Sequence, residues 1–293
     1  MKESSFEGIG GLKIFARSWQ PEGEPRGVIV IVHGLNSHSG QYFWTAEQFT
    51  KNGLAVYALD LRGRGRSEGE RFYVEKIDDF INDVETLVKQ AKAENSGLPV
   101  FMLGHSAGGV TACVYALEYQ SEIDGLICES FAYELPVPDI VLTFLKGLSY
   151  ITPHTHVFSL KNEDFSRDPK IVEEMNGDIY IKGESQPAQT AKTLLDADAR
   201  LTREFSNITL PVLILHGTAD KATKPSGSRH FYEAAGSSDK TLKLYEGHFH
   251  DLLNDLDKEI VMADIQSWID ERIPAKTETA KTETAETSAI SGA

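Results

Sequence analysis

The stretch VFMLGHSAGGV, residues 100–110, decides the fold of this chain. Four apolar residues lead directly into Gly104, and Ser106 lies between this glycine and Gly108. The pattern G-x-S-x-G, placed after a buried strand and before a helix, is typical of a sharp turn that exposes a serine hydroxyl. Glycines also occur in tight turns that have no catalytic role, so the rest of the sequence has to distinguish the two interpretations.

Apolar runs similar to residues 100–105 recur along the chain and predict a sheet. Four more are VIVIVHG (28–34), LAVYALD (54–60), GLICES (125–130) and PVLILHG (211–217). Continuous runs rich in valine, isoleucine and leucine are typical of parallel strands buried on both faces. Segments with helical periodicity alternate with them at 41–53, 77–95 and 107–120. This alternation predicts a mostly parallel, doubly wound α/β sheet. Residues 11–21 predict an antiparallel edge strand.

The alternation stops between residues 131 and 205, where we expect an inserted, mainly helical cap. This segment has scattered prolines, an apolar stretch at 139–151 and a polar stretch at 159–174. The strand pattern returns only at Pro211. A cap over a core made of residues 1–130 and 206–273 fits this pattern, and ordinary helices of the same layer are the alternative.

Composition and charge exclude several classes of function. A formal net charge of −15 argues against binding to nucleic acid, because phosphates require basic patches. The first residues lack the basic and apolar regions of a secretory signal, and no apolar run approaches the roughly 18 residues needed to span a bilayer. We therefore expect a cytoplasmic protein, in which Cys113 and Cys128 are buried free thiols. Residues 274–293 repeat KTETA and predict a disordered tail.

Ser106 requires a base, and the base requires a group that orients it, because a serine hydroxyl is a poor nucleophile. In a scaffold with G-x-S-x-G before a helix, an acid and then a histidine follow the serine along the chain. Asp220 lies in the turn after the strand at 211–217, at the edge where open α/β sheets form their active sites. Asp196 and Asp198, inside the expected cap, are weaker candidates.

Two histidines compete for the role of the base. The segment LYEGHFHDLL, residues 244–253, contains His248 and His250 just after a predicted strand, and spacing alone does not choose between them. A His-x-His pair also suggests metal ligands, as does His154 with His156. No HExxH motif or cysteine cluster accompanies either pair, so we expect neither a metal nor another cofactor.

An oxyanion formed by attack of Ser106 needs two backbone N–H donors. One is expected from Ala107, the residue after the serine. The other is expected from Leu35, because the strand that ends at His33–Gly34 can turn this N–H toward the same point. The arginine-rich segment LDLRGRGRSEGE, residues 59–70, matches neither common phosphate-binding motif and is predicted to be a loop after a strand.

Together these segments resemble the monoacylglycerol lipase and lysophospholipase branch of the α/β-hydrolase superfamily. The matching pieces occur in order between residues 27 and 273: HGLNSHSGQY, DLRGRGRSEGER, LPVFMLGHSAGG, LPVLILHGTADKATKPSGS and DKTLKLYEGHFHDLLND. In the family motif Y-E-G-x-x-H the last residue is the catalytic histidine, which falls on His250 rather than His248. The resemblance assigns the nucleophile, the acid and the two oxyanion donors to Ser106, Asp220, Leu35 and Ala107. The family usually has methionine after the nucleophile, so Ala107 predicts a roomier pocket.

The resemblance implies a cofactor-independent serine hydrolase that cleaves carboxylic esters through an acyl-enzyme on Ser106. Its expected substrates are monoacylglycerols or similar lipid-like monoesters. The alternatives are a lysophospholipase, a short-chain or aromatic carboxylesterase, a peptidase or an acyltransferase. A non-catalytic binding module is the alternative from a different class. We expect the apolar segment 140–151 to line an acyl channel or contact a lipid surface, with plain packing against the core as the alternative.

Overall fold

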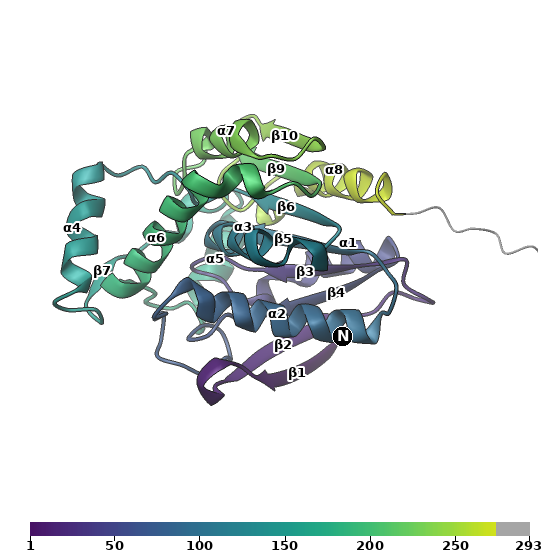
Figure 1. The fold of residues 1–293 in the computed structure, drawn as a ribbon, viewed down its shortest axis with the longest axis horizontal. Coiled ribbons are helices and arrows are strands. Elements are labelled where there is room, and N and C mark those ends of the chain that lie inside the picture. Colours follow the sequence, from purple (N-terminus) through teal and green to yellow (C-terminus); the bar gives the residue numbers. More distant parts are fainter. Residues whose placement is uncertain (274–293) are drawn as a thin grey trace, which may run out of the picture.

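A central sheet organises the molecule. The computed structural model describes residues 1–273, and the predicted disordered tail (274–293) lies outside the described residues. The strands of the sheet are β1 (Lys2–Glu7), β2 (Lys13–Trp19), β3 (Gly27–Val32), β4 (Leu54–Leu59), β5 (Val100–His105), β6 (Gly125–Glu129), β9 (Val212–Gly217) and β10 (Lys240–Tyr245). Within the described residues they form one eight-stranded sheet in the order β1-β2-β4-β3-β5-β6-β9-β10 (Figure 1).

The five apolar runs of the sequence form β3, β4, β5, β6 and β9, and all five are parallel. Every residue of these strands is buried, which explains why the runs are continuous rather than alternating. The prediction for residues 11–21 was right about direction and wrong about position. β2 is antiparallel to β4, but β1 pairs with its other side and forms the edge. With the sequence KESSFE and mostly exposed side chains, β1 lacks the apolar signal of the other strands.

Within residues 1–273, helices outside the segment between β6 and β9 cover the two faces of the sheet. They are α1 (Phe43–Lys51), α2 (Ile77–Glu94), α3 (Ala107–Tyr119), α7 (Pro225–Ala234) and α8 (Lys258–Asp270). Side chains from α2, α3 and α7 pack into one large hydrophobic cluster, and those from α1 and α8 pack into another. Alternate residues of β3 point to the two clusters, as the pleat requires. The described residues therefore form the doubly wound α/β architecture expected from the sequence.

The chain leaves the sheet after β6 and returns with β9. Between them lie α4 (Asp139–Ser149), β7 (His156–Phe158), α5 (Pro169–Gly177), β8 (Gln186–Pro187) and α6 (Ala188–Glu204), with β7 and β8 paired antiparallel. We call residues 131–205 the insertion. Figure 1 shows α4 at the outer left and α6 leading from it toward the helices over the sheet. Because Ala197 and Leu201 of α6 belong to the main hydrophobic cluster, the exact boundaries of a separate cap stay a prediction.

Two predictions from composition concern the whole described chain. Cys113 and Cys128 are both buried and free, as expected. Among residues 1–273, no helix has the length and apolar character needed to cross a membrane.

Candidate active site

Ser106 lies at the junction of β5 and α3, on the carboxyl edge of the sheet. Its backbone angles, φ 57° and ψ −121°, are rare for a residue with a side chain and indicate local strain. A Cβ added at Gly104 would collide with the backbone at Gly108, and one added at Gly108 would collide with β3. The glycines of G-x-S-x-G are therefore required by close backbone packing around this turn.

Asp220 follows β9 and His250 follows β10, so both side chains reach the same edge of the sheet as Ser106. His250 Nδ1 lies 2.7 Å from Asp220 Oδ2, and both side chains are fully buried. This contact fixes the ring so that Nδ1–H donates to the carboxylate and Nε2 is the acceptor nitrogen. Two segments 30 residues apart thus form the acid–histidine pair that the sequence order predicted.

The carboxylate of Asp220 is held by several donors besides His250. Its Oδ1 accepts hydrogen bonds from the backbone N–H groups of Ala222 and Thr223, at 2.8 and 2.9 Å. Its Oδ2 accepts from Thr223 Oγ1 at 2.8 Å and lies 3.1 Å from His216 Nε2. Burial opposes the charge, but His250 and His216 outweigh it and hold the pKa of Asp220 well below its ordinary value. Asp220 therefore stays ionised.

The acceptor nitrogen of His250 is free. His250 Nε2 has no hydrogen-bond partner within residues 1–273, although the ring is fully buried. Ser106 is also buried, at 3 % exposure, and no hydrogen bond joins its hydroxyl to His250 there. Catalytic hydrogen bonds are commonly long before substrate binds. A buried basic nitrogen without a partner is suited to accept a proton from a nearby hydroxyl.

The other candidates for base and acid lie elsewhere. His248 Nδ1 faces Asp255 at 3.9 Å, and burial together with Arg167 lowers the pKa of His248. Asp196 pairs with two lysines of the insertion at 2.5 and 2.6 Å, on a partly exposed surface. Asp198 is buried in a cavity wall, where its Oδ1 has no partner among the described residues. Of the two candidate histidines, His250 is the one whose ring contacts Asp220.

The turn after β3 places Leu35 beside the nucleophile. A Cβ on Gly34 would come 2.8 Å from Ser106 Cβ, so the two loops are in direct contact. Ala107 is the first residue of α3, where helical N–H groups have no partner within the helix. Leu35 and Ala107 line the same cavity as Ser106, and no hydrogen bond from their N–H groups occurs within the described residues. Both predicted oxyanion donors are thus close to the serine.

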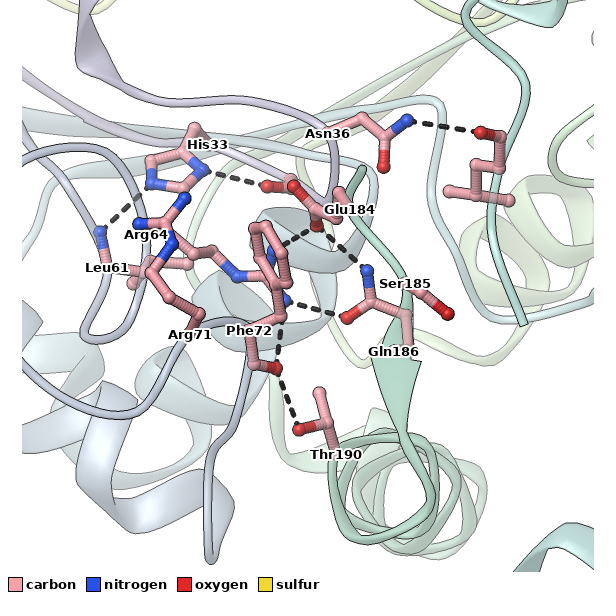
Figure 2. A network of polar contacts seen from close by, with 12 residues as sticks. His33, Asn36, Leu61, Arg64, Arg71, Phe72, Glu184, Ser185, Gln186 and Thr190 are labelled. Carbon is pink, nitrogen blue, oxygen red and sulfur yellow. Dashed lines mark hydrogen bonds and ion pairs between the residues drawn. The ribbon is translucent and has the colours of Figure 1, made fainter. Parts of the chain in front are cut away.

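The turn that carries Leu35 is fixed by a neutral histidine, which Figure 2 shows. His33 Nδ1 donates to the carbonyl oxygen of Gly34 at 2.7 Å, and Nε2 accepts from the Leu61 N–H at 2.9 Å. Burial lowers the pKa of His33 to about 3, so the ring has one donor and one acceptor nitrogen. Asn36 Nδ2 then donates to the carbonyl oxygen of Leu160 at 3.2 Å, which ties the turn to the insertion.

A buried polar network joins the insertion to the loop after β4 (Figure 2). Arg64 forms an ion pair with Glu184, and both side chains are 1 % exposed. Arg64 also donates to Gln186 Oε1 at 2.8 Å, and Thr190 Oγ1 donates to the carbonyl oxygen of Phe72 at 3.0 Å. The arginine-rich segment is thus a loop after a strand, as predicted, and Arg64 anchors the insertion.

A cavity of about 320 Å³ opens beside Ser106. Its wall is mostly apolar, with a few polar and charged side chains, and comes from both the core and the insertion. Representative lining residues are Ala107, Ala132, Leu142, Leu145, Val157 and Leu194. A largely apolar cavity with few polar groups is typical of a small-molecule site. The serine hydroxyl therefore faces a space suited to an apolar chain.

A buried polar cluster lies below the acid–histidine pair, and sequence analysis missed it. A ring nitrogen of His105 and carboxylate oxygens of Glu129 and Asp251 lie within 4.8 Å of one another. Burial and the nearby Asp251 raise the pKa of Glu129, and burial lowers the pKa of His105 to about 4. The ring of His105 lies 5.0 Å from that of His250. The uncharged ring of His105 thus lies beside that of His250. The signal available in the sequence was Glu129, an acidic residue at the end of an otherwise apolar strand.

Comparisons with known proteins show which family the chain is similar to. A family model described as serine aminopeptidase, S33, matches residues 23–257. Monoacylglycerol lipase of Mycolicibacterium smegmatis is 34% identical over 269 residues, covering 91% of this chain and 96% of that protein. Human monoglyceride lipase is also 34% identical, over 89% of this chain and 88% of its own length.

Solved structures give the same result. The crystal structure of the Paleococcus ferrophilus monoacylglycerol lipase superposes with a TM-score of 0.80 at 29% identity, covering 88% of this chain and 99% of that one. The comparisons confirm the resemblance found in the sequence and the predicted α/β-hydrolase fold.

Proposed function

Because the chain belongs to the serine aminopeptidase S33 family, we propose that it is a carboxylic ester hydrolase that cleaves monoacylglycerols and similar lipid-like monoesters. The observation that carries the proposal is the position of Ser106, strained at the end of a strand and opening into an apolar cavity. An acyl chain fits such a wall. A peptide would leave its amide groups without partners there, which is costly, so hydrolysis of esters is favoured over hydrolysis of peptides.

Ser106, His250 and Asp220 provide each proton transfer of an acyl-enzyme reaction. Ser106 Oγ attacks the ester carbonyl while His250 Nε2 takes its proton. Asp220 holds the Nδ1–H tautomer and stabilises the imidazolium that forms. The N–H groups of Leu35 and Ala107 stabilise the oxyanion. His250 then protonates the leaving alcohol, and a water activated by the same nitrogen releases the acid from Ser106.

The insertion supplies the substrate side of the site. We propose that residues 131–205 act as a cap over Ser106. The apolar stretch of α4 and the turn after it leaves several large side chains exposed, among them Ile140 at 79 %, Phe144 at 67 % and Ile151 at 80 %. A contiguous exposed apolar surface is typical of an interaction site. This surface contacts the lipid phase from which the ester enters the cavity.

A lysophospholipase is the second candidate. Lys161 and Lys221 line the same cavity, and neither forms an ion pair within the described part of the chain. Two such lysines favour an anionic head group on the alcohol side of the ester.

Labelling with a fluorophosphonate and hydrolysis of emulsified monoacylglycerols test the proposal. Ser106→Ala is expected to abolish labelling and to lower kcat by about 10⁶-fold, because the nucleophile is lost. Ser238→Ala, at an exposed serine outside the insertion, is the matched control and should leave the labelling and kcat unchanged. Ser106-independent turnover would refute the serine mechanism. A preference for acetyl esters would refute the lipid assignment, and a preference for lysophospholipids would favour the second candidate.

A further inference from the structure

The wall of the cavity formed by α6 contains one acidic side chain. Ala191, Leu194, Leu195 and Asp198 of α6 all line the cavity. Their spacing of i, i+3, i+4 and i+7 places them on one face of the helix. Three of the four are apolar, as the wall of an acyl site requires, and an apolar residue is expected at the fourth position as well. Asp198 is therefore a polar group inside an apolar surface.

One oxygen of the Asp198 carboxyl group is buried without a partner among the described residues. Asp198 is 9 % exposed, and its Oδ1 has no hydrogen-bond partner in residues 1–273. Asp196, two residues earlier, pairs instead with Lys146 and Lys192 on the outer side of the helix. Burial raises the pKa of Asp198 well above its ordinary value, which favours the neutral acid. A neutral carboxylic acid has one O–H donor and one carbonyl acceptor.

The fold places this group along the cavity rather than against the nucleophile. α6 packs against α3, and Asp198 lies near Cys113 of that helix. Cys113 lies six residues beyond Ala107 on the same helix, a rise of about 9 Å. An acyl chain that extends from Ser106 along this wall therefore passes Asp198 several carbons beyond the ester bond.

A buried polar group without a partner destabilises the folded protein unless a ligand satisfies it. We propose that Asp198 selects esters whose acyl chain carries an oxygen, as a hydroxyl or keto group, at the carbon that faces it. A chain hydroxyl accepts a hydrogen bond from the Asp198 O–H and donates one to its carbonyl oxygen, whereas a keto oxygen accepts only. A plain alkyl chain leaves the group unsatisfied. This inference rests on the proposed hydrolysis at Ser106 and names the acyl group that the same site prefers.

A positional series of glycerol monoesters tests the inference. All the esters have the same acyl chain length. One carries no substituent, the others of the series carry a hydroxyl or keto group at successive carbons, and a further ester carries an amine at the end of the chain. The wild-type protein should hydrolyse at least one hydroxylated or keto isomer with a kcat/KM about tenfold higher than that of the plain ester, the value of one well-placed hydrogen bond. Asp198→Leu should remove this preference and raise kcat/KM for the plain ester. Asp198→Asn, which keeps a donor and an acceptor, should retain it.

Asp196→Asn is the matched control, because it removes a carboxylate from the outer face of the same helix and should leave the preference unchanged. Equal rates for all isomers in the wild-type protein would overturn the inference, and this result does not depend on the folding of any variant. A preference for the amine, which needs an ionised carboxylate, would also overturn it. Absence of Ser106-dependent hydrolysis of every ester, the plain one included, would instead overturn the proposed function.

Discussion

The core side and the insertion side of the cavity are held by different kinds of contact. On the core side, Asp220 accepts three hydrogen bonds besides the one from His250, and both of its carboxylate oxygens have defined partners. On the insertion side, α4 presents apolar side chains to the cavity on one face and to solvent on the other. Directional hydrogen bonds fix atoms, whereas apolar contact fixes only shape and volume. We therefore expect the core side to be sensitive to single atoms and the insertion side to tolerate substitution.

The largest effect is expected from Asp220→Asn. This change keeps the shape of the side chain but removes the charge and the acceptor that hold the Nδ1–H tautomer of His250, so kcat should fall about 10⁴-fold. The measurement is steady-state hydrolysis of a soluble p-nitrophenyl ester. Asp239→Asn, in an exposed pair with Arg272, is the control and should keep full activity. A loss below tenfold would mean that Asp220 does not orient the base.

An intermediate effect is expected where the two sides are joined. Glu184→Gln leaves the charge of Arg64 buried without its partner, which should lower the free energy of unfolding in urea by about 3–5 kcal/mol. Replacing both residues with methionine should cost less than the single change, because no unpaired charge remains. Glu47→Gln removes an exposed ion pair with Lys51 and should change stability by less than about 1 kcal/mol. Equal losses in the two single variants would contradict this account.

The smallest effect on the folded protein is expected from α4. Ile140→Ser and Phe144→Ser alter side chains that are 79 % and 67 % exposed, so stability should change by no more than about 0.5 kcal/mol. Turnover of a soluble ester should stay the same, while turnover of emulsified monoacylglycerol falls several-fold. Ile260→Ser, at an exposed position on α8, should change neither rate. A parallel loss with both substrates would show that α4 acts on the chemistry instead of on contact with lipid.

The parts of the fold that were predictable are those with a periodic signal. The strands β3, β4, β5, β6 and β9 are buried on both faces and stand out as continuous apolar runs, whereas the polar edge strand β1 gave no such signal. The ion pair between Arg64 and Glu184 joins positions 120 residues apart, so no local pattern indicates it. Long-range pairing of polar groups depends on the assembled fold.

The candidate site was also only partly predictable from the sequence. Chain order after Ser106 pointed to Asp220, but spacing left His248 and His250 equivalent, and only the family resemblance separated them. In the structure the two rings diverge because they lie in an irregular segment after β10, where alternate positions do not share a face; His250 contacts Asp220 and His248 faces Asp255. The sequence suggested Asp198 only as a weaker candidate for the catalytic acid. Its position in the cavity wall depends on how α6 packs against neighbouring elements, which the sequence does not show.

The strained backbone of Ser106 has a consequence for how this protein can be improved. At φ 57° and ψ −121°, the position suits glycine better than serine, so the residue that defines the active site is also one that opposes folding. Selection for thermostability alone would favour Ser106→Gly and discard catalysis. Engineering for heat resistance therefore has to score turnover as well as melting temperature, and its gains have to come from elsewhere in the chain.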